Sequence, residues 1–276
     1  MILLDRGEYE KVTEALRAVT INNLFARSVL EKIIKGSVYV DNTEHPETFY
    51  ISHPYGMSLL FGKTDHVDFN ARLRDYALNT FKIRDRYEWL QVFPEAWNQT
   101  LAELFADKMV KSKDNTGKDN NNKIEENTRV NFKFNREKYL DFKSKNPPTS
   151  YKIVRTNKEM YENMQGSVIP KYFWRDAEHF CKDGTGFSLI YKDRVDSTAY
   201  SAFILDNKLE IGIETIADTR GKGFAASACA ALIDYCLEND YEPVWACKLE
   251  NAASYHLAQK LGFEPTFYIP FYRLII

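Results

Sequence analysis

The chain has 276 residues, of which 44% are hydrophobic and 28% are charged, a balance typical of a globular protein with one large or two ordinary domains. Its formal net charge of −2 provides no basic surface for nucleic acid or for an anionic membrane, so neither partner is expected. No apolar run is long enough to span a bilayer, and charged residues follow the first four residues too soon for a signal peptide. We therefore expect a cytoplasmic protein.

The four cysteines, at positions 181, 229, 236 and 247, form no CxxC pair. Cysteines without such spacing in a cytoplasmic protein are typical of reduced, buried thiols. The five histidines show no spacing typical of a ligand pair. No metal site is expected.

The first half of the sequence has the pattern of an α/β domain. Its apolar periodicity predicts helices between residues 8 and 35, strands at 37–42, 48–52 and 57–62, a helix at 69–79, a strand at 87–93 and a helix after Pro94. Residues 111–127 then contain a single apolar residue, Ile124, and so polar a stretch cannot repay the entropy lost on ordering. We expect a mobile linker there, between domains 1–125 and 126–276.

The second half predicts a mixed, twisted sheet with helices packed on it. A strand at 129–134 and a helix at 136–142 come first, then a strand at 151–157, a helix from 158, and an aromatic-rich helical segment at 169–180. The remaining predicted elements are strands at 185–191, 197–205 and 208–215, a helix, a strand at 243–248, a helix from 251 and a strand at 266–272. Asn239 is the predicted left-handed terminator of the first of these helices. Asp206 and Asn207 supply a hairpin turn.

The turn from Arg220 to Ala225, with the sequence RGKGFA, follows a strand and opens an apolar-striped helix. The first N–H groups of a helix have no internal partner and carry partial positive charge. Glycine lets the backbone approach a phosphate closely, and Arg220 and Lys222 add positive charge. The turn therefore predicts a pyrophosphate site that is neither a Walker loop nor a dinucleotide fingerprint. The alternative is a helix start that uses glycine only to turn the chain.

A second segment, residues 251–263, follows the strand at 243–248; Asn251 can cap its helix and Gly262 can end it. Together the two segments resemble the GNAT acetyltransferase superfamily, through the pattern [RQ]-x-x-G-x-[GA] followed by N-x-x-[SA] and K-x-G-F. The matching residues are Arg220, Gly223, Ala225, Asn251, Ser254, Lys260, Gly262 and Phe263. The spacing of Trp245, Cys247 and Asn251 is also similar to a two-domain GNAT subgroup that includes the acetyltransferase giving self-resistance to zwittermicin A.

The resemblance implies a GNAT fold whose sheet splays between the strands at 208–215 and 243–248, with acetyl-CoA as the cofactor. The backbone near Ile213 and Thr215 would pair with the pantetheine arm, and Asn251 and Ser254 would complete the cofactor-binding set. The pyrophosphate would be held by the amides of the turn, which belong to Gly221, Lys222, Gly223, Phe224 and Ala225.

Acetyl transfer to an amine needs a base, and the resemblance places the candidates on the strand at 208–215. Glu210 and Glu214 are even-spaced and so share one face of that strand. The alternative for each is an ordinary solvated carboxylate. Many family members use a tyrosine as general acid at the position of Ala258. The thiolate would then leave without a protein acid, or Tyr268 or Tyr272 would supply one.

We expect an acetyl-CoA-dependent N-acetyltransferase acting on a primary amine of a small polar molecule; a protein lysine is a further acceptor class. The alternative is a GNAT module that binds coenzyme A without turnover. Trp174 is the candidate for acceptor contact, whereas Phe173 and Phe180 are expected in the core. The N-terminal domain lacks the glycine turn, so we expect a degenerate copy that binds no second cofactor. It would shape the acceptor pocket or pair subunits in a homodimer.

Overall fold

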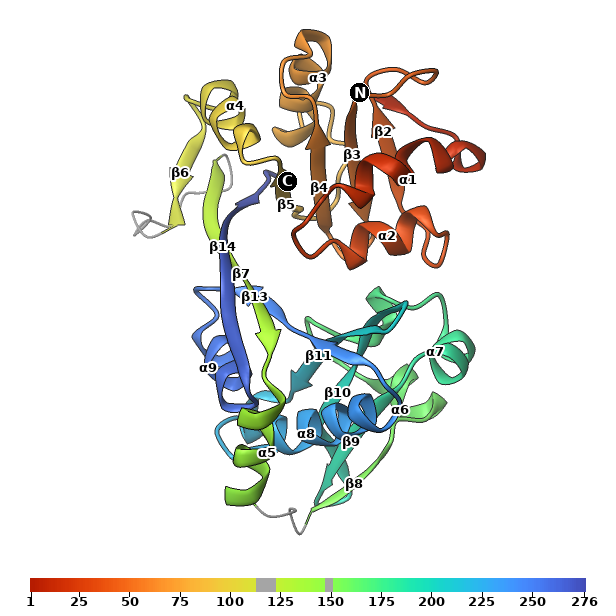
Figure 1. Cartoon of the computed structure of the whole chain (residues 1–276), viewed down its shortest axis with the longest axis vertical. Helices are drawn as coiled ribbons and strands as arrows, with labels where there is room; N and C mark the ends of the chain where they lie inside the picture. Colours follow the sequence, from red (N-terminus) through yellow and green to blue (C-terminus); the bar gives the residue numbers. More distant parts are fainter. Residues whose placement is uncertain (113–122, 147–150) are drawn as a thin grey trace. The chain divides into compact units, whose positions relative to one another are not determined.

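The computed structural model describes residues 1–112, 123–146 and 151–276 (Figure 1). The chain divides into two compact units. The first comprises Met1–Arg129, Lys248–Glu250 and Tyr268–Ile276, and the second comprises Val130–Cys247 and Asn251–Phe267. The first unit thus extends past residue 125 and includes two segments that the sequence suggested for the C-terminal domain.

The final strand, β14 (Phe263–Arg273), accounts for much of this difference. It is 11 residues long, and at its end Tyr272 and Arg273 pair with Leu90 and Trp89. Those partners belong to the first unit. Such a pairing over a long sequence distance has no local signal in the sequence.

The first unit is a twisted sheet with helices. Its elements are β1 (Ile2–Leu3), α1 (Glu10–Arg17), α2 (Leu24–Leu30), β2 (Ser37–Val40), β3 (Thr48–His53), β4 (Met57–Gly62), α3 (Val67–Ala77), β5 (Trp89–Phe93), α4 (Ala96–Leu104) and β6 (Met109–Lys111). Strands β2, β3 and β4 form an antiparallel meander, and β5 lies parallel to β4. A core of Tyr50, Leu60, Leu73 and Trp97 joins the meander to α3 and α4.

Part of the polar stretch expected to be mobile is a strand. β7 (Ile124–Phe134) begins at Ile124, whose side chain is buried in the core of the first unit. The first three residues of β7 pair with β6, and Glu125 forms an ion pair with Arg273 at 2.8 Å. These contacts stabilise the strand and offset the entropy lost when it is ordered. A polar stretch without such contacts could not offset that loss. Residues 113–122 of the expected linker lie outside the described residues.

The second unit contains the segments with the family resemblance. Its elements are α5 (Arg136–Lys145), β8 (Lys152–Arg155), α6 (Lys158–Asn163), a 3₁₀ turn (Pro170–Tyr172), α7 (Ala177–Asp183), β9 (Gly186–Tyr191), β10 (Arg194–Leu205), β11 (Lys208–Thr215), α8 (Phe224–Glu238), β12 (Glu242–Val244), β13 (Ala246–Lys248) and α9 (Ala252–Lys260). Its sheet has the order β12-β11-β10-β9-β8, antiparallel except for the β11–β12 pair.

Both faces of this sheet are covered. On one face, α8 packs Cys229, Leu232 and Cys236 against β10 and β11. On the other, Phe173 lies against Tyr200, with ring centroids 5.9 Å apart. Phe173 and Phe180 are 4% and 0% exposed, so their predicted place in the core is confirmed.

Three local predictions are corrected. The helical segment at 169–180 is the 3₁₀ turn and α7, separated because Asp176 caps a new helix by accepting from His179 N. The terminator after α8 is Asp240, with φ of 58°, and Asn239 precedes it with φ of −117°. Cys181 is exposed, whereas the other three cysteines are buried. Burial raises the pKa of the Cys236 thiol to about 12, which makes it a poor nucleophile.

The two units repeat one order of elements. Beginning at β1 in the first unit and at β8 in the second, each has a strand, two α-helices, an antiparallel meander of three strands, a helix, a fourth strand parallel to the third, and a helix. The meander is β2-β3-β4 in the first unit and β9-β10-β11 in the second. The first unit is thus a second copy of the fold.

Candidate active site

Helix α8 opens from a glycine turn that faces open space. Gly221 and Gly223 have φ of 81° and 83°, a region that residues with a Cβ rarely adopt. A Cβ built at either position would meet nothing within 4 Å. The left-handed backbone explains why glycine stands here, and the open space beside it leaves room for a ligand.

The backbone N–H groups of this turn have no hydrogen-bond partner among the described residues. The N-cap, Gly223, makes no side-chain capping bond, and the first helical bond runs from Ser227 N to the Gly223 carbonyl at 3.1 Å. In the described ranges, the amides of residues 221–225 donate to no protein acceptor. An anion at such a helix start is stabilised by about 0.3–1 kcal/mol, and by more where it is partly buried.

The neighbouring strands separate beside this turn. β11 and β12 pair only from Lys208–Glu242 to Glu210–Val244. At the next residue, the Trp245 carbonyl accepts from Phe132 N at 3.1 Å, which turns the chain toward β7. The strand expected at 243–248 is therefore two strands. From residue 211 to 215, β10 is the one described strand that pairs with β11.

The open edge of β11 presents the backbone that was expected to bind a cofactor arm. Ile216 N donates to the Asp196 carbonyl, at the start of β10. Successive residues of a strand direct their backbone N–H and C=O groups to opposite sides, so those of Ile213 and Thr215 point away from β10, into the opening. The Thr215 carbonyl already accepts from Arg220 Nε at 3.1 Å. Ile213 is therefore the better placed of the two.

The basic side chains of the turn lie in different directions. Arg220 bends back to β11, where its guanidinium lies 3.5 Å from Glu214 Oε1. The Lys222 ammonium lies over the ring of Tyr191, 5.2 Å from its centroid. Phe224 is 2% exposed, so only its amide can face a ligand.

Asn251 and Ser254 support the opening between the strands. Asn251 Oδ1 caps α9 by accepting from Ser254 N at 3.2 Å, as the sequence suggested. The Ser254 hydroxyl accepts from the indole N–H of Trp245 at 3.3 Å. These contacts fix the residue at which β12 ends, and direct cofactor contact by Asn251 and Ser254 remains a prediction.

Glu210 and Glu214 lie on the face of β11 opposite α8. Ile211 packs against α8, so the side chains on either side of it point to the other face. Glu210 is 7% exposed and lies where β12 departs. Between the two carboxylates, the ring of Tyr200 covers Gly212, where a Cβ would lie 2.5 Å from it. Tyr200 was not predicted from the sequence, although a glycine inside a strand indicates such a close approach.

Glu214 holds a loop and is no ordinary solvated carboxylate. Its Oε2 accepts from Ser167 N at 2.9 Å and from Val168 N at 3.0 Å. The side chain is 11% exposed, and its other oxygen faces Arg220. Glu214 thus links the loop after α6 to the glycine turn.

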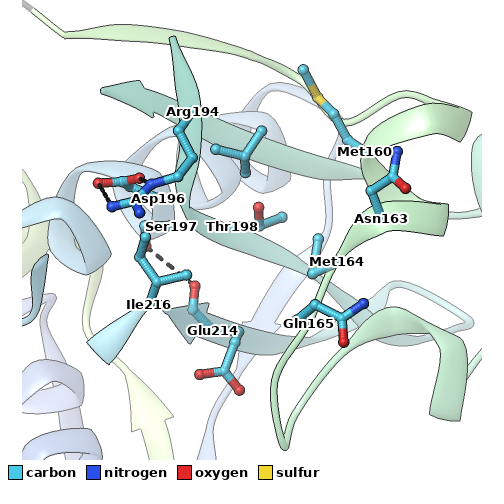
Figure 2. A pocket seen from close by; sticks show the side chains of 11 residues that line it. Met160, Asn163, Met164, Gln165, Arg194, Asp196, Ser197, Thr198, Glu214 and Ile216 are labelled. Atoms are coloured by element: carbon cyan, nitrogen blue, oxygen red, sulfur yellow. Dashed lines mark hydrogen bonds and ion pairs between the residues drawn. The ribbon is translucent and has the colours of Figure 1, made fainter. Parts of the chain in front are cut away.

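A pocket of about 240 Å³ adjoins Glu214. Figure 2 shows the residues of α6 and the loop after it on one side, facing the start of β10 on the other. On the β10 side, Arg194 Nε donates to the buried carboxylate of Asp196 at 2.7 Å. The lining residues come from three separate segments: Met160, Asn163, Met164, Gln165, Arg194, Val195, Asp196, Ser197, Thr198, Glu214 and Ile216.

Trp174, predicted to contact the acceptor, lies in the core. It is 5% exposed, and its indole N–H donates to the Ser201 carbonyl at 2.7 Å. A register shift in β10 between Ser201 and Phe203 interrupts the ladder at that carbonyl. The buried indole has its hydrogen bond and does not line the pocket beside Glu214.

No general acid emerges from the tyrosines that the sequence suggested. The usual position, Ala258, is 0% exposed in the core. Tyr272 is 2% exposed, and its hydroxyl donates to Asn98 inside the first unit. Burial raises the pKa of Tyr272. Tyr268 is 52% exposed and also belongs to the first unit.

In the first unit, which has the same fold, the corresponding strands do not separate and the corresponding helix start is capped. β4 and β5 pair without interruption from Met57–Trp89 to Phe61–Phe93. The start of α3 is capped by His66, whose ring accepts from Phe69 N at 3.2 Å. The open edge and the uncapped helix of the second unit are therefore additions to this fold and not requirements of it.

Residues 1–112, 123–146 and 151–276, which the structure describes, contain neither a metal-binding cluster nor a membrane-spanning helix. In these ranges no three His, Cys, Asp or Glu side chains gather closely enough to hold a metal ion. No helix within them has the length and apolar character needed to cross a membrane.

Comparison with known proteins agrees with this geometry. The GNAT acetyltransferase family model matches residues 15–272. An uncharacterized N-acetyltransferase of Bacillus subtilis (strain 168), YdfB, is 26% identical over 242 residues, 87% of this chain and 86% of that protein. A GCN5-related N-acetyltransferase-like protein from Streptococcus suis 89/1591 has a similar structure, with a TM-score of 0.71, 22% identity and coverage of 98% of this chain and 100% of that one.

A tandem GNAT protein from the clavulanic acid biosynthesis pathway has a similar structure, with a TM-score of 0.58 and 10% identity. The matched region covers 99% of this chain and 97% of that one. At these identities the two structures show the shared fold. The family match extends over nearly the whole chain. The chain therefore belongs to the GNAT acetyltransferase family and is an acyltransferase.

Proposed function

We propose that this protein is an acetyl-CoA-dependent N-acetyltransferase that acetylates a primary amine of a small polar molecule. One observation supports the proposal above the others: the unpartnered amides of residues 221–225 adjoin the edge of β11 that has lost its neighbouring strand. A helix start binds a diphosphate, and a free strand edge binds an extended chain of amides.

Acetyl-coenzyme A, when bound, would supply the acetyl group as a thioester and leave as the coenzyme A thiol. The residues present fit it. The amides of residues 221–225 would bind the diphosphate with the help of Lys222, and the backbone of Ile213 would pair with the amide-containing arm. The empty space beside Gly221 and Gly223 leaves the approach to these amides unobstructed.

Glu210 is the base in this proposal. It faces away from α8 at the residue where the strands part, which is where the opening begins. An amine attacks only when neutral, so a carboxylate here would accept the proton that the acceptor ammonium loses. Glu214 has a positioning role, because its carboxylate is already engaged by the loop and by Arg220.

The pocket beside Glu214 supports a small acceptor. Its volume of about 240 Å³ suits a small molecule better than a protein segment. Met160 and Met164 contribute an apolar wall, and the polar side chains of Asn163 and Gln165 can bind a small polar acceptor. The resemblance to the subgroup that includes the zwittermicin A self-resistance enzyme makes aminopolyols the first acceptor class to test.

Release of the coenzyme A thiol tests the proposal. Purified protein with acetyl-CoA is expected to release thiol in the presence of at least one member of a panel of aminopolyols, aminoglycosides, polyamines and amino acids. Lysine peptides serve as the comparison class. Cofactor binding without acceptor-stimulated release across the panel would favour the alternative, a coenzyme A-binding module without turnover.

Substitutions at Glu214 separate positioning from proton transfer. Glu214→Gln keeps an oxygen that the amides of Ser167 and Val168 can reach, whereas Glu214→Ala removes it. Glu214→Ala is expected to raise the acceptor KM about tenfold by loosening the loop that lines the pocket, and Glu214→Gln to raise it far less. Initial rates against acceptor concentration measure both. A collapse of kcat in Glu214→Gln would instead make Glu214 the base.

A further inference from the structure

We infer that Lys192, together with Tyr191, forms a subsite for the nucleotide end of coenzyme A, in which the Lys192 ammonium binds the ribose 3′-phosphate. The inference rests on the proposed function, because it assumes that the diphosphate lies on the glycine turn. Neither residue belongs to the motifs that identified the turn. Tyr191 ends β9, and Lys192 begins the hairpin to β10.

An aromatic cluster joins this hairpin to the glycine turn. The ring of Phe224, the first residue of α8, lies 5.2 Å from that of Tyr191 and 4.9 Å from that of Tyr151, measured between centroids. The rings of Tyr151 and Tyr191 are 5.6 Å apart at 80°. Phe224 is buried, so it fixes the two tyrosines beside the free amides. A base attached to a diphosphate on those amides has aromatic surface within reach.

Two ammonium groups converge on one of these rings. Lys192 Nζ lies 5.3 Å from the centroid of Tyr191, and Lys222 Nζ lies 5.2 Å from it. In the part of the chain that the structure describes, neither lysine forms an ion pair with a carboxylate. Two uncompensated cations near one ring repel each other, and an anion between them would relieve that repulsion.

The hairpin conformation places Lys192 at this position. Lys192 and Asp193 both have positive φ, 50° and 61°, and Tyr191 pairs directly with Arg194. A two-residue turn of this kind usually contains Asn or Gly, since other residues are disfavoured there. The turn brings the ammonium of Lys192 back over the preceding tyrosine.

The chemistry identifies the ligand group. Coenzyme A carries, beyond its diphosphate, an adenine ring and a 3′-phosphate. The adenine matches the tyrosine surface, and the phosphate matches an ammonium that pairs with no carboxylate of the described residues. Lys222 lies in the turn itself and serves the diphosphate, which leaves Lys192 for the 3′-phosphate.

Titration calorimetry of the whole chain with coenzyme A and with dephospho-coenzyme A, which lacks only the 3′-phosphate, tests the inference. The unmodified protein is expected to bind coenzyme A about tenfold more tightly. Lys192→Met should remove this preference by weakening coenzyme A alone, and Lys192→Arg should keep it. Lys222→Met should weaken both ligands. Lys182→Met, at an exposed position of α7, is the control and should change neither.

Equal binding of the two ligands by the unmodified protein, or equal weakening of both in Lys192→Met, would overturn the inference. Either result would leave the diphosphate site intact. Absence of binding by both ligands is a different failure, because it would remove the proposed function itself.

Discussion

Replacing Gly223 by valine is expected to abolish acetyl-CoA binding, lowering the affinity by about 100-fold or more while the chain still folds. The valine would place its side chain in the open space that a phosphate needs, and it would strain a residue with φ of 83°. Since no described residue beyond the two chain neighbours lies within 4 Å of the added Cβ, the main cost to folding is backbone strain of about 1–2 kcal/mol. Calorimetry and a thermal melt measure the two effects separately.

Gly262→Ala is the matched control for Gly223→Val. Gly262 also has positive φ, 87°, but a Cβ there would lie 2.7 Å from Tyr139 N. This variant should lower the melting temperature and leave the cofactor affinity of the folded protein unchanged. Normal acetyl-CoA binding by Gly223→Val would show that the diphosphate does not lie on this turn.

Glu210→Gln is expected to lower kcat by about 10²–10³-fold with little change in the KM for acetyl-CoA. The amide is nearly the same size as the carboxylate but cannot take the proton from the acceptor ammonium. The loss should shrink as the pH is raised, because more of the acceptor is then already neutral. Full pH profiles of kcat for the variant and the unmodified protein measure this.

Glu242→Gln, on the exposed part of β12, provides the comparison for Glu210→Gln. It makes the same chemical change on the strand paired with β11 and should leave the pH profile as it is. If Glu210→Gln retained full kcat while Glu214→Gln lost it, the two glutamates would exchange roles.

The sequence predicted the turn and the helix of the site because their signals are local. Glycines at positions 221 and 223, followed by an apolar stripe on α8, specify a helix start with free amides from nearest neighbours alone. Glu210 and Glu214 are likewise separated by an even number of residues, and the two-residue period of a strand places them on the same face.

The remaining features depend on partners that lie far away in the sequence. The strand expected at 243–248 breaks at Trp245 because its carbonyl is taken by Phe132. Trp174 is buried because a register shift in β10 leaves the Ser201 carbonyl for its indole. The engagement of Glu214 by Ser167 and Val168 is equally remote. Neither the hydrophobic periodicity nor the composition of the sequence encodes such long-range pairings. The pocket that they form could therefore not be predicted.

The unfinished side of β11 also affects how the protein behaves in solution. A strand with exposed amides and carbonyls on one side is a template on which another molecule can add a strand, and native proteins usually cover such edges. Here the cover would be the coenzyme itself, since none of the described strands pairs with this side of β11 from residue 211 to 215. Preparations stripped of coenzyme should therefore self-associate sooner on storage than those kept saturated with it.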